Sequence, residues 1–103
     1  MFSIFLKNPS ISTSELSKCL ANGIKLIDVR TAQEYRGGHI AQAKNVPLDR
    51  IERYQGKAKE IYVICQSGMR SKQAVQILQK KGYEAINVRG GMNQWTGNVR
   101  GGK

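Results

Sequence analysis

Two segments of the chain place apolar residues at spacings of three and four, the period of an amphipathic helix. In the first, at about residues 13 to 21, one face carries Leu16, Cys19 and Leu20. This segment follows Ser12-Thr13-Ser14-Glu15, which has the form of a capping box, and Gly23 is a suitable stop. In the second, residues 70 to 81, the apolar face consists of Ala74, Val75, Ile77 and Leu78. The pattern therefore predicts two helices that each turn one face toward the core.

Short apolar runs between polar segments predict the strands. They are IKLIDV at 24–29, NVPL at 45–48, IYVI at 61–64 and AINV at 85–88. Continuous apolar runs that alternate with helical patterns are typical of strands buried on both faces, so we expect an α/β fold with a mainly parallel sheet and helices on both faces. DRIERY at 49–54 is expected to form one or two helical turns and GGMNQW at 90–95 a short last helix. TAQEY and GGHI, between 31 and 40, are interpreted as a polar connection and a turn.

Length and composition favour a single globular domain. The chain has 103 residues, 40% of them hydrophobic, and no run approaches the roughly 20 apolar residues of a membrane span. MFSIFLK at the start has no preceding positive charge, is interrupted at Ser3 and ends its apolar run at Lys7, so we interpret residues 1–6 as an arm packed on the domain rather than a secretory signal. Without an export signal we expect a cytoplasmic protein, and nothing in the sequence requires more than a monomer.

The chain is strongly basic, with 17 Lys and Arg against seven Asp and Glu and a formal net charge of +10. Such a field attracts anions and acidic partners without naming them. The basic residues are scattered and accompany no nucleic-acid-binding motif, so nucleic acid is not expected as the main partner.

The two cysteines lie in different surroundings. Cys19 is on the apolar face of the first predicted helix and is interpreted as structural, with a resolving or disulfide-forming thiol as the alternative. Two separated cysteines form neither a disulfide framework nor a clustered metal site, and we expect no metal and no cofactor. Cys65 is different because it stands where the apolar run IYVI stops and a polar loop begins.

That loop has the composition of an anion-binding site. A strand-to-helix loop turns several backbone N–H groups toward one point, and the helix terminus adds partial positive charge. Gly68 allows a tight turn, and Arg70 brings a permanent charge with a planar set of donors. A cysteine in such a place has a lowered pKa and more thiolate at neutral pH. We therefore predict Cys65 as a nucleophile, in preference to a packed core cysteine.

Three segments, in this order, resemble those of single-domain rhodaneses, the thiosulfate sulfurtransferase-like family. LIDVRTAQEYRGGHIAQAKNVPL at 26–48 is similar to the family's first signature, CQSGMRS at 65–71 to its active-site loop, and NVRGGMNQW at 87–95 to its closing Gly-Gly-Trp segment. The resemblance covers nearly all of the chain from about residue 11. We accordingly divide the chain into an N-terminal arm (1–10), one rhodanese-like domain (11–98) and a short basic tail (99–103).

The resemblance implies a five-stranded parallel sheet and a two-step transfer of sulfur. Cys65 takes a sulfur atom from a donor as a persulfide and passes it to a thiophilic acceptor such as cyanide or a thiol. The loop that holds this sulfur is formed by Gln66, Ser67, Gly68, Met69, Arg70 and Ser71, with Arg70 steadying the negative charge.

Other residues of the matching segments are assigned supporting roles. Asp28 is expected to brace the active-site loop, and Arg30 either to brace it or to attract the anion. His39 and Trp95 are interpreted as structural, with Trp95 in the core or a pocket wall.

Two alternatives remain open at this stage. Phosphatases of the cell-division type share the fold and an EYxGGHI-like segment, but their loop follows H-C-x5-R, whereas here Ile64 precedes the cysteine and four residues separate it from Arg70. A phosphatase or arsenate reductase is therefore less favoured. Neutral Gln66 stands where efficient users of thiosulfate often carry a basic residue, so the donor is either a small anion or a protein persulfide. A sulfur-relay or binding module that acts with a protein partner is the second alternative.

Overall fold

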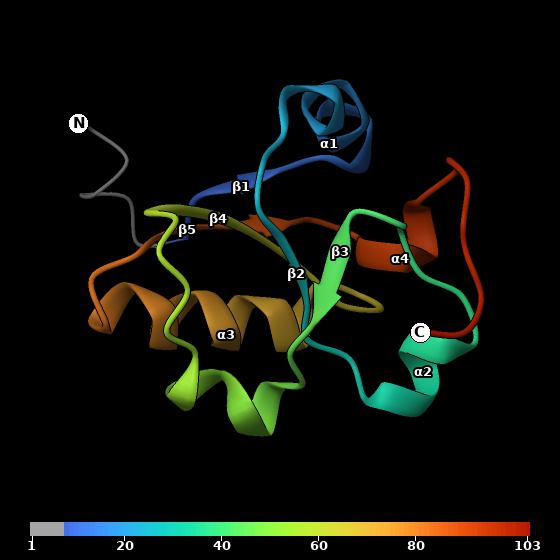
Figure 1. Cartoon of the computed structure of the whole chain (residues 1–103). Helices are drawn as coiled ribbons and strands as arrows, with labels where there is room; N and C mark the ends of the chain where they lie inside the picture. Colours follow the sequence, from blue (N-terminus) through green and yellow to red (C-terminus); the bar gives the residue numbers. More distant parts are fainter. Residues whose placement is uncertain (1–7) are drawn as a thin grey trace.

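The computed structural model describes residues 8–103, and the segment 1–7, which includes most of the expected N-terminal arm, lies outside the described residues. Within this range the chain forms one five-stranded sheet, in which all paired strands are parallel and the order is β1-β5-β4-β2-β3 (Figure 1). The strands are β1 (Ser10–Ile11), β2 (Leu26–Asp28), β3 (Ala43–Asn45), β4 (Glu60–Ile64) and β5 (Glu84–Val88). The expected parallel α/β fold is confirmed.

Helices and short 3-10 segments connect the strands. They are α1 (Thr13–Cys19), the 3-10 helix η2 (Leu20–Asn22), α2 (Ala32–Arg36), the 3-10 helix η3 (Leu48–Arg53), α3 (Met69–Lys80) and α4 (Gly91–Gln94). Ser12 and Glu15 form the expected capping box at the start of α1, and Gly23 ends η2 in the left-handed region at φ 70°. Among the described residues, no helix combines the length and apolar character needed to cross a membrane.

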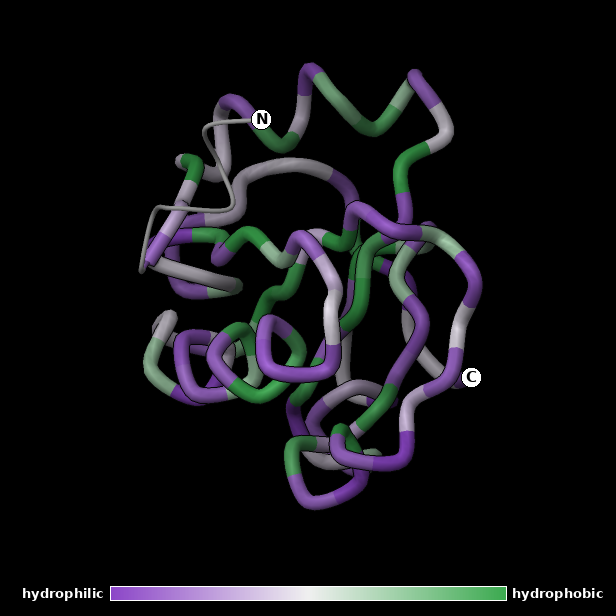
Figure 2. The backbone as a smooth tube through the Cα atoms, turned by 90° about the vertical axis from the view of Figure 1, so that its left-hand side faces the viewer, coloured by the Kyte–Doolittle hydropathy of each residue, from purple (hydrophilic) through white to green (hydrophobic). Residues whose placement is uncertain are grey.

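Alternate strand residues supply two apolar layers, one on each face of the sheet. In β4, Ile61 and Val63 face α3 and η3, whereas Ile64 packs on the other side, where Leu16 of α1 lies. Figure 1 shows α3 on one side of the sheet and α1 on the other, and the central strands in Figure 2 are largely green. The apolar runs are thus buried on both faces, as expected for a parallel sheet covered by helices.

Two expectations about the elements were wrong. The strand expected at 45–48 is Ala43–Asn45, because Pro47 has no N–H for the ladder and the exposed Lys44 of this edge strand hides the apolar signal. The polar segment TAQEY contains a helix, α2, whose cap is a second capping box made by Thr31 and Glu34. The pattern also did not indicate β1, because two residues at a sheet edge show no periodicity.

The parallel arrangement brings the carboxyl ends of β2, β4 and β5 to one edge of the sheet. Asp28 ends β2, Cys65 directly follows β4, and Val88 ends β5. Because ligand sites of parallel sheets lie beyond these ends, the fold itself places Cys65 where chemistry is expected.

Candidate active site

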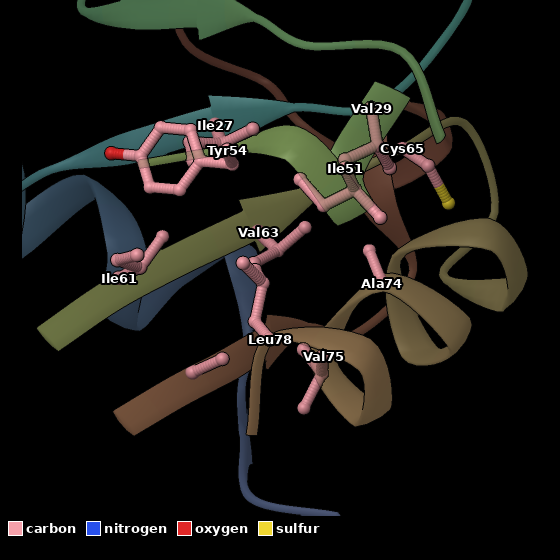
Figure 3. Packing of buried hydrophobic residues seen from close by; sticks show 11 residues of the cluster. Ile27, Val29, Ile51, Tyr54, Ile61, Val63, Cys65, Ala74, Val75 and Leu78 are labelled. Atoms are coloured by element: carbon pink, nitrogen blue, oxygen red, sulfur yellow. The ribbon is translucent and has the colours of Figure 1, made fainter. Parts of the chain in front are cut away.

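The side chain of Cys65 lies between the core and the loop that enters α3. The residue is fully buried, and its backbone continues the apolar layer formed by Val63 and Ala74 (Figure 3). In Figure 3 its sulfur points away from that layer into the turn at the start of α3. The Gly68 N–H donates to Cys65 Sγ over 3.1 Å, and Ser71 Oγ lies 3.3 Å from the same sulfur. The loop therefore wraps around the sulfur atom.

A left-handed glycine makes this wrapping possible. Gly68 has φ 102°, a conformation that residues with a side chain rarely adopt, and it immediately precedes α3. A second glycine, Gly91, at φ 55°, lies so close to the loop that a Cβ atom there would collide with the carbonyl oxygen of Cys65. Met92 N–H donates to that same carbonyl over 2.8 Å, so the start of α4 is fastened to the loop. The Gly-Gly segment is thus part of the site's framework.

The environment favours the thiolate of Cys65 despite its burial. Burial is the largest single influence and raises the pKa of the thiol, because it disfavours charge. Hydrogen bonds that a thiolate can accept from the Ser71 hydroxyl and from the backbone N–H groups of Ser71, Gly68 and Ser67 act in the opposite direction and lower the pKa. Together they outweigh burial, and the pKa of Cys65 lies below its ordinary value. The loop amides thus favour the thiolate, and their role in holding a transferred sulfur stays a prediction.

The Arg70 side chain, which the sequence analysis expected to steady negative charge at the loop, is paired with another residue. Its guanidinium forms two hydrogen bonds with the carboxylate of Glu34, over 2.7 Å and 3.0 Å, and both side chains are about one third exposed. The hydrogen bond from Arg70 is the main cause that lowers the pKa of Glu34 to about 2, against burial that raises it. The charge of Arg70 is thus largely balanced before any substrate anion arrives.

Arg30 is fixed behind the loop. Its five N–H donors all have acceptors: both carboxylate oxygens of Asp28, the carbonyls of Glu34 and Gly38, and the side-chain amide oxygen of Gln66. The Asp28–Arg30 pair is buried, with side-chain exposures of 0% and 5%. Of the two roles left open for Arg30, this geometry favours bracing, because each donor that could hold a substrate anion is already occupied.

A hollow of about 350 Å³ opens on the outer side of the loop. It is lined by Arg30, Gln33, Glu34, Gly37, Gly38, Gln66 and Met92. Cys65 does not line this hollow and is fully buried, so a molecule in the hollow does not contact its sulfur directly. Met69, the first residue of α3, is 70% exposed and presents an apolar side chain to solvent.

The remaining predicted residues lie outside this site. His39 is buried, stacks on Tyr35 with ring centroids 3.6 Å apart, and its Nδ1 donates to the Tyr35 carbonyl. Trp95 packs on the layer that contains Leu16. Cys19 is half-buried and lies beside Tyr62, on the face of the sheet opposite the Cys65 layer, and both cysteines are free.

Two residues of the site were missed by the sequence analysis. Glu34 had a detectable signal, because Thr31-x-x-Glu34 repeats the capping-box spacing found at Ser12. Asn87 lies beneath the loop, where it accepts a short hydrogen bond from the Ser71 hydroxyl and donates to the Gly68 carbonyl over 3.3 Å. Its signal was a polar residue inside the apolar run AINV, which we did not interpret. In residues 8–103, no group of three or more His, Cys, Asp or Glu side chains is arranged to hold a metal ion.

Comparison with known proteins agrees with this geometry. The profile of the Rhodanese-like domain family matches residues 12–98. The chain is 37% identical to the putative sulfurtransferase YtwF of Bacillus subtilis, over 87% of this chain and 92% of that protein. It is 38% identical to the putative sulfur carrier protein YrkF of the same organism, over 72% of this chain but only 42% of that protein. The protein YqhL of Bacillus subtilis is 39% identical, and the match spans 74% of this chain and 64% of that protein.

Solved structures agree as well. The crystal structure of a rhodanese-like domain protein from Staphylococcus aureus superposes with a TM-score of 0.82 at 34% identity, covering 92% of this chain and 99% of that chain. The family profile, the relatives and the solved structure agree with one another. The chain therefore belongs to the rhodanese-like domain family.

Proposed function

We propose that this chain is a sulfurtransferase that carries a sulfane sulfur atom on Cys65 as a persulfide. The observation that carries the proposal is the enclosure of Cys65 Sγ by N–H and O–H donors of its own loop, with a lowered pKa of the thiol in a buried position. A thiolate is the form that attacks sulfur, and the same donors suit the negative charge of a persulfide.

The proposed reaction has two substitutions at sulfur. The Cys65 thiolate attacks the outer sulfur of a donor such as thiosulfate, the S–S bond of the donor breaks, and sulfite leaves with the electron pair. The acceptor, a thiol or cyanide, then attacks the outer sulfur of the Cys65 persulfide, and Cys65 leaves as a thiolate. No external oxidant or reductant is needed, because the sulfane sulfur moves without net redox change.

The surroundings of Cys65 support a persulfide donor over free thiosulfate. Glu34 balances Arg70, Asp28 balances Arg30, and the side chain after Cys65 is neutral Gln66. A dianion therefore meets little unpaired positive charge at the hollow, although the whole chain has a formal charge of +10. We place the reaction in the cytoplasm and the chain as a monomer.

A relay role with a protein partner is the second candidate. The name of its relative YrkF refers to sulfur carriage. The exposed Met69 next to the loop offers an apolar contact for a partner that docks over Cys65 and shifts the loop. A phosphatase receives no support, because the guanidinium of Arg70 is already paired with the carboxylate of Glu34.

Mass spectrometry tests the proposal directly. The protein is incubated with thiosulfate, and separately with cysteine persulfide, and then digested without reductant. We expect a mass gain of one sulfur atom on the peptide that contains Cys65, removed by cyanide and absent from Cys65→Ala. The absence of this adduct with both donors would refute the proposal, and turnover of a phosphate ester that depends on Cys65 would favour the phosphatase.

A further inference from the structure

Asn87 closes a buried ring of hydrogen bonds with the active-site loop. It lies in β5 with 9% of its surface exposed, and Ser71 in the first turn of α3 is fully buried. The ring runs from Cys65 Sγ to Ser71 Oγ, to the side chain of Asn87, to the Gly68 carbonyl, and back through the Gly68 N–H to Cys65. Asn87 has no contact with the hollow, so it acts on Cys65 through its neighbours.

The direction of each hydrogen bond follows from the Gly68 carbonyl, which can only accept. The Asn87 atom that faces it must therefore be the donor Nδ2, and the atom that faces Ser71 must be the acceptor Oδ1. Ser71 has one hydroxyl proton, and it is committed to Asn87. The oxygen of Ser71 can then only accept from Cys65, so the ring as it stands is satisfied when Cys65 is a protonated thiol.

Ionisation of Cys65 reverses one of these bonds. The thiol proton leaves to solvent, and the thiolate is an acceptor that requires a donor. The Ser71 hydroxyl must rotate from Asn87 Oδ1 to Cys65 Sγ, because its single proton cannot serve both acceptors. Asn87 Oδ1 then loses its donor in a buried place, which costs free energy. The Gly68 carbonyl is unaffected, since it also accepts from Lys72 N–H over 3.2 Å.

We propose that Asn87 is a positioning residue that holds the Ser71 hydroxyl proton while Cys65 is a thiol, and that it thereby opposes formation of the nucleophile. When a persulfide forms, the negative charge moves to the outer sulfur, and the Ser71 hydroxyl is free to return to Asn87. The inference rests on the proposed function, because it describes how ionisation of Cys65, the nucleophile of that reaction, is opposed. Its test measures ionisation alone and does not require sulfur transfer.

Charged groups around Cys65 do not provide this control. Arg70 of α3 is close enough to Cys65 for an electrostatic interaction, but its guanidinium is paired with Glu34 of α2. Asp28 at the end of β2, next to β4, is paired with Arg30. Lys72 of α3 and Arg89 after β5 are exposed. These groups stay the same when Asn87 is changed, so they do not confound the comparison below.

The test compares the ionisation of Cys65 in four proteins that all carry Cys19→Ala, so that Cys65 is the one thiol. They are the parent, Asn87→Leu, Ser71→Ala and the double variant. The rate of alkylation by iodoacetamide is measured from pH 5 to 10, and urea unfolding confirms that each protein is folded. Leucine has nearly the shape of asparagine and removes the competing acceptor. We expect Asn87→Leu to shift the pH midpoint downward, with alkylation below the midpoint roughly twofold to tenfold faster.

Ser71→Ala removes the donor to the thiolate and is expected to shift the midpoint upward. The decisive comparison is the double variant, whose midpoint should equal that of Ser71→Ala, because Asn87 acts only through the hydroxyl. If Asn87 merely braced the loop, Asn87→Leu would loosen the Gly68 N–H and raise the midpoint, with or without Ser71. An unchanged or raised midpoint in Asn87→Leu, or an equal shift in both backgrounds, overturns the inference.

A second measurement needs no change at Asn87. The side-chain carbonyl carbon of Asn87 is followed by NMR during a pH titration in the Cys19→Ala protein and in its Ser71→Ala variant. We expect its resonance to move at the midpoint of Cys65 in the first protein, when Asn87 loses its donor, and to stay nearly constant in the second. A constant resonance in the first protein, or equal movement in both, contradicts the inference. Either result is independent of whether any donor loads Cys65 with sulfur.

Discussion

Arg70 and Glu34 lie 36 positions apart in the sequence and meet through two hydrogen bonds of 2.7 Å and 3.0 Å. Arg70 belongs to the first turn of α3, next to the Cys65 loop, and Glu34 to the capping box of α2. The pair joins α2, whose Glu34 lines the hollow, to the start of α3. The pair also balances the charge of Arg70, so we expect it to affect both the stability of the protein and the choice of sulfur donor.

Release of Arg70 from its partner should increase the use of thiosulfate. In Glu34→Gln, the positive charge is no longer balanced and a negative charge leaves the edge of the hollow. We expect thiosulfate to load Cys65 roughly threefold to tenfold faster, with a gain that shrinks as salt is raised. The rate is measured as persulfide formation by mass spectrometry.

Glu15→Gln is a matched control, because Glu15 occupies the same capping-box position at α1, lies 3.9 Å from Arg89 and does not line the hollow. It should change helix capping without changing the thiosulfate rate. Equal rates of loading by thiosulfate in the two variants would show that the Arg70–Glu34 pair does not determine which sulfur donor the protein uses.

The Glu34 carboxyl should also affect how stability depends on pH. Its pKa is lowered from 4.5 to about 2 in the folded protein, so its contribution is fully present above about pH 4.5 and is lost as the pH falls toward 2. We expect Glu34→Gln to be less stable than the parent at pH 7, with a difference that shrinks between pH 4.5 and 2. Because both side chains are partly exposed, the difference at pH 7 should be about 1 kcal/mol, measured by urea unfolding. A difference that does not vary with pH would contradict this assignment.

Gly68 and Gly82 have nearly the same backbone conformation, so comparing their alanine variants distinguishes a specific effect on the active-site loop from the cost of backbone strain alone. Gly68 has φ 102° and Gly82, after α3, has φ 101°, but a Cβ at Gly82 meets open space, whereas one at Gly68 lies 3.3 Å from Gly90 N. Substitution by alanine should cost about 1 kcal/mol of stability at either position.

Only Gly68→Ala should also displace the N–H that donates to Cys65, and we expect its sulfur transfer to fall by about tenfold to a hundredfold. Urea unfolding and persulfide formation are measured for both variants. A similar loss of activity in Gly82→Ala would refute the role of the Gly68 turn.

The buried pair behind the loop should be costly to break. Asp28→Asn leaves Arg30 buried without its counter-charge, and we expect a loss of about 3 kcal/mol in the free energy of unfolding. Asp28→Leu combined with Arg30→Met removes both charges and should recover much of this loss while leaving the loop unbraced. If the single and double variants are equally unstable by urea unfolding, packing rather than charge pairing holds this region.

Local sequence patterns were sufficient to predict the main helices and strands that form the layers of the fold. The capping box at Ser12, the helical spacing of Ala74 and Leu78, and the apolar run before Cys65 each depend on neighbouring residues, so each is visible in one sequence. They placed Cys65 at the end of a parallel strand, and the chemistry that the loop composition suggests for it stays a prediction. Expectations were wrong where the local signal was weak, at the edge strand β3 and in the five residues of α2.

The sequence by itself thus determined an α/β domain with a cysteine between a strand and a helix, because periodicity, caps and turns are short-range. Only the tertiary structure decided that Arg70 would be bound by Glu34 and that Asn87 would lie beneath Ser71. These contacts depend on the strand order β1-β5-β4-β2-β3 and on the path of each crossover. Such long-range geometry comes from the packing of whole elements, and no local spacing of residues specifies it.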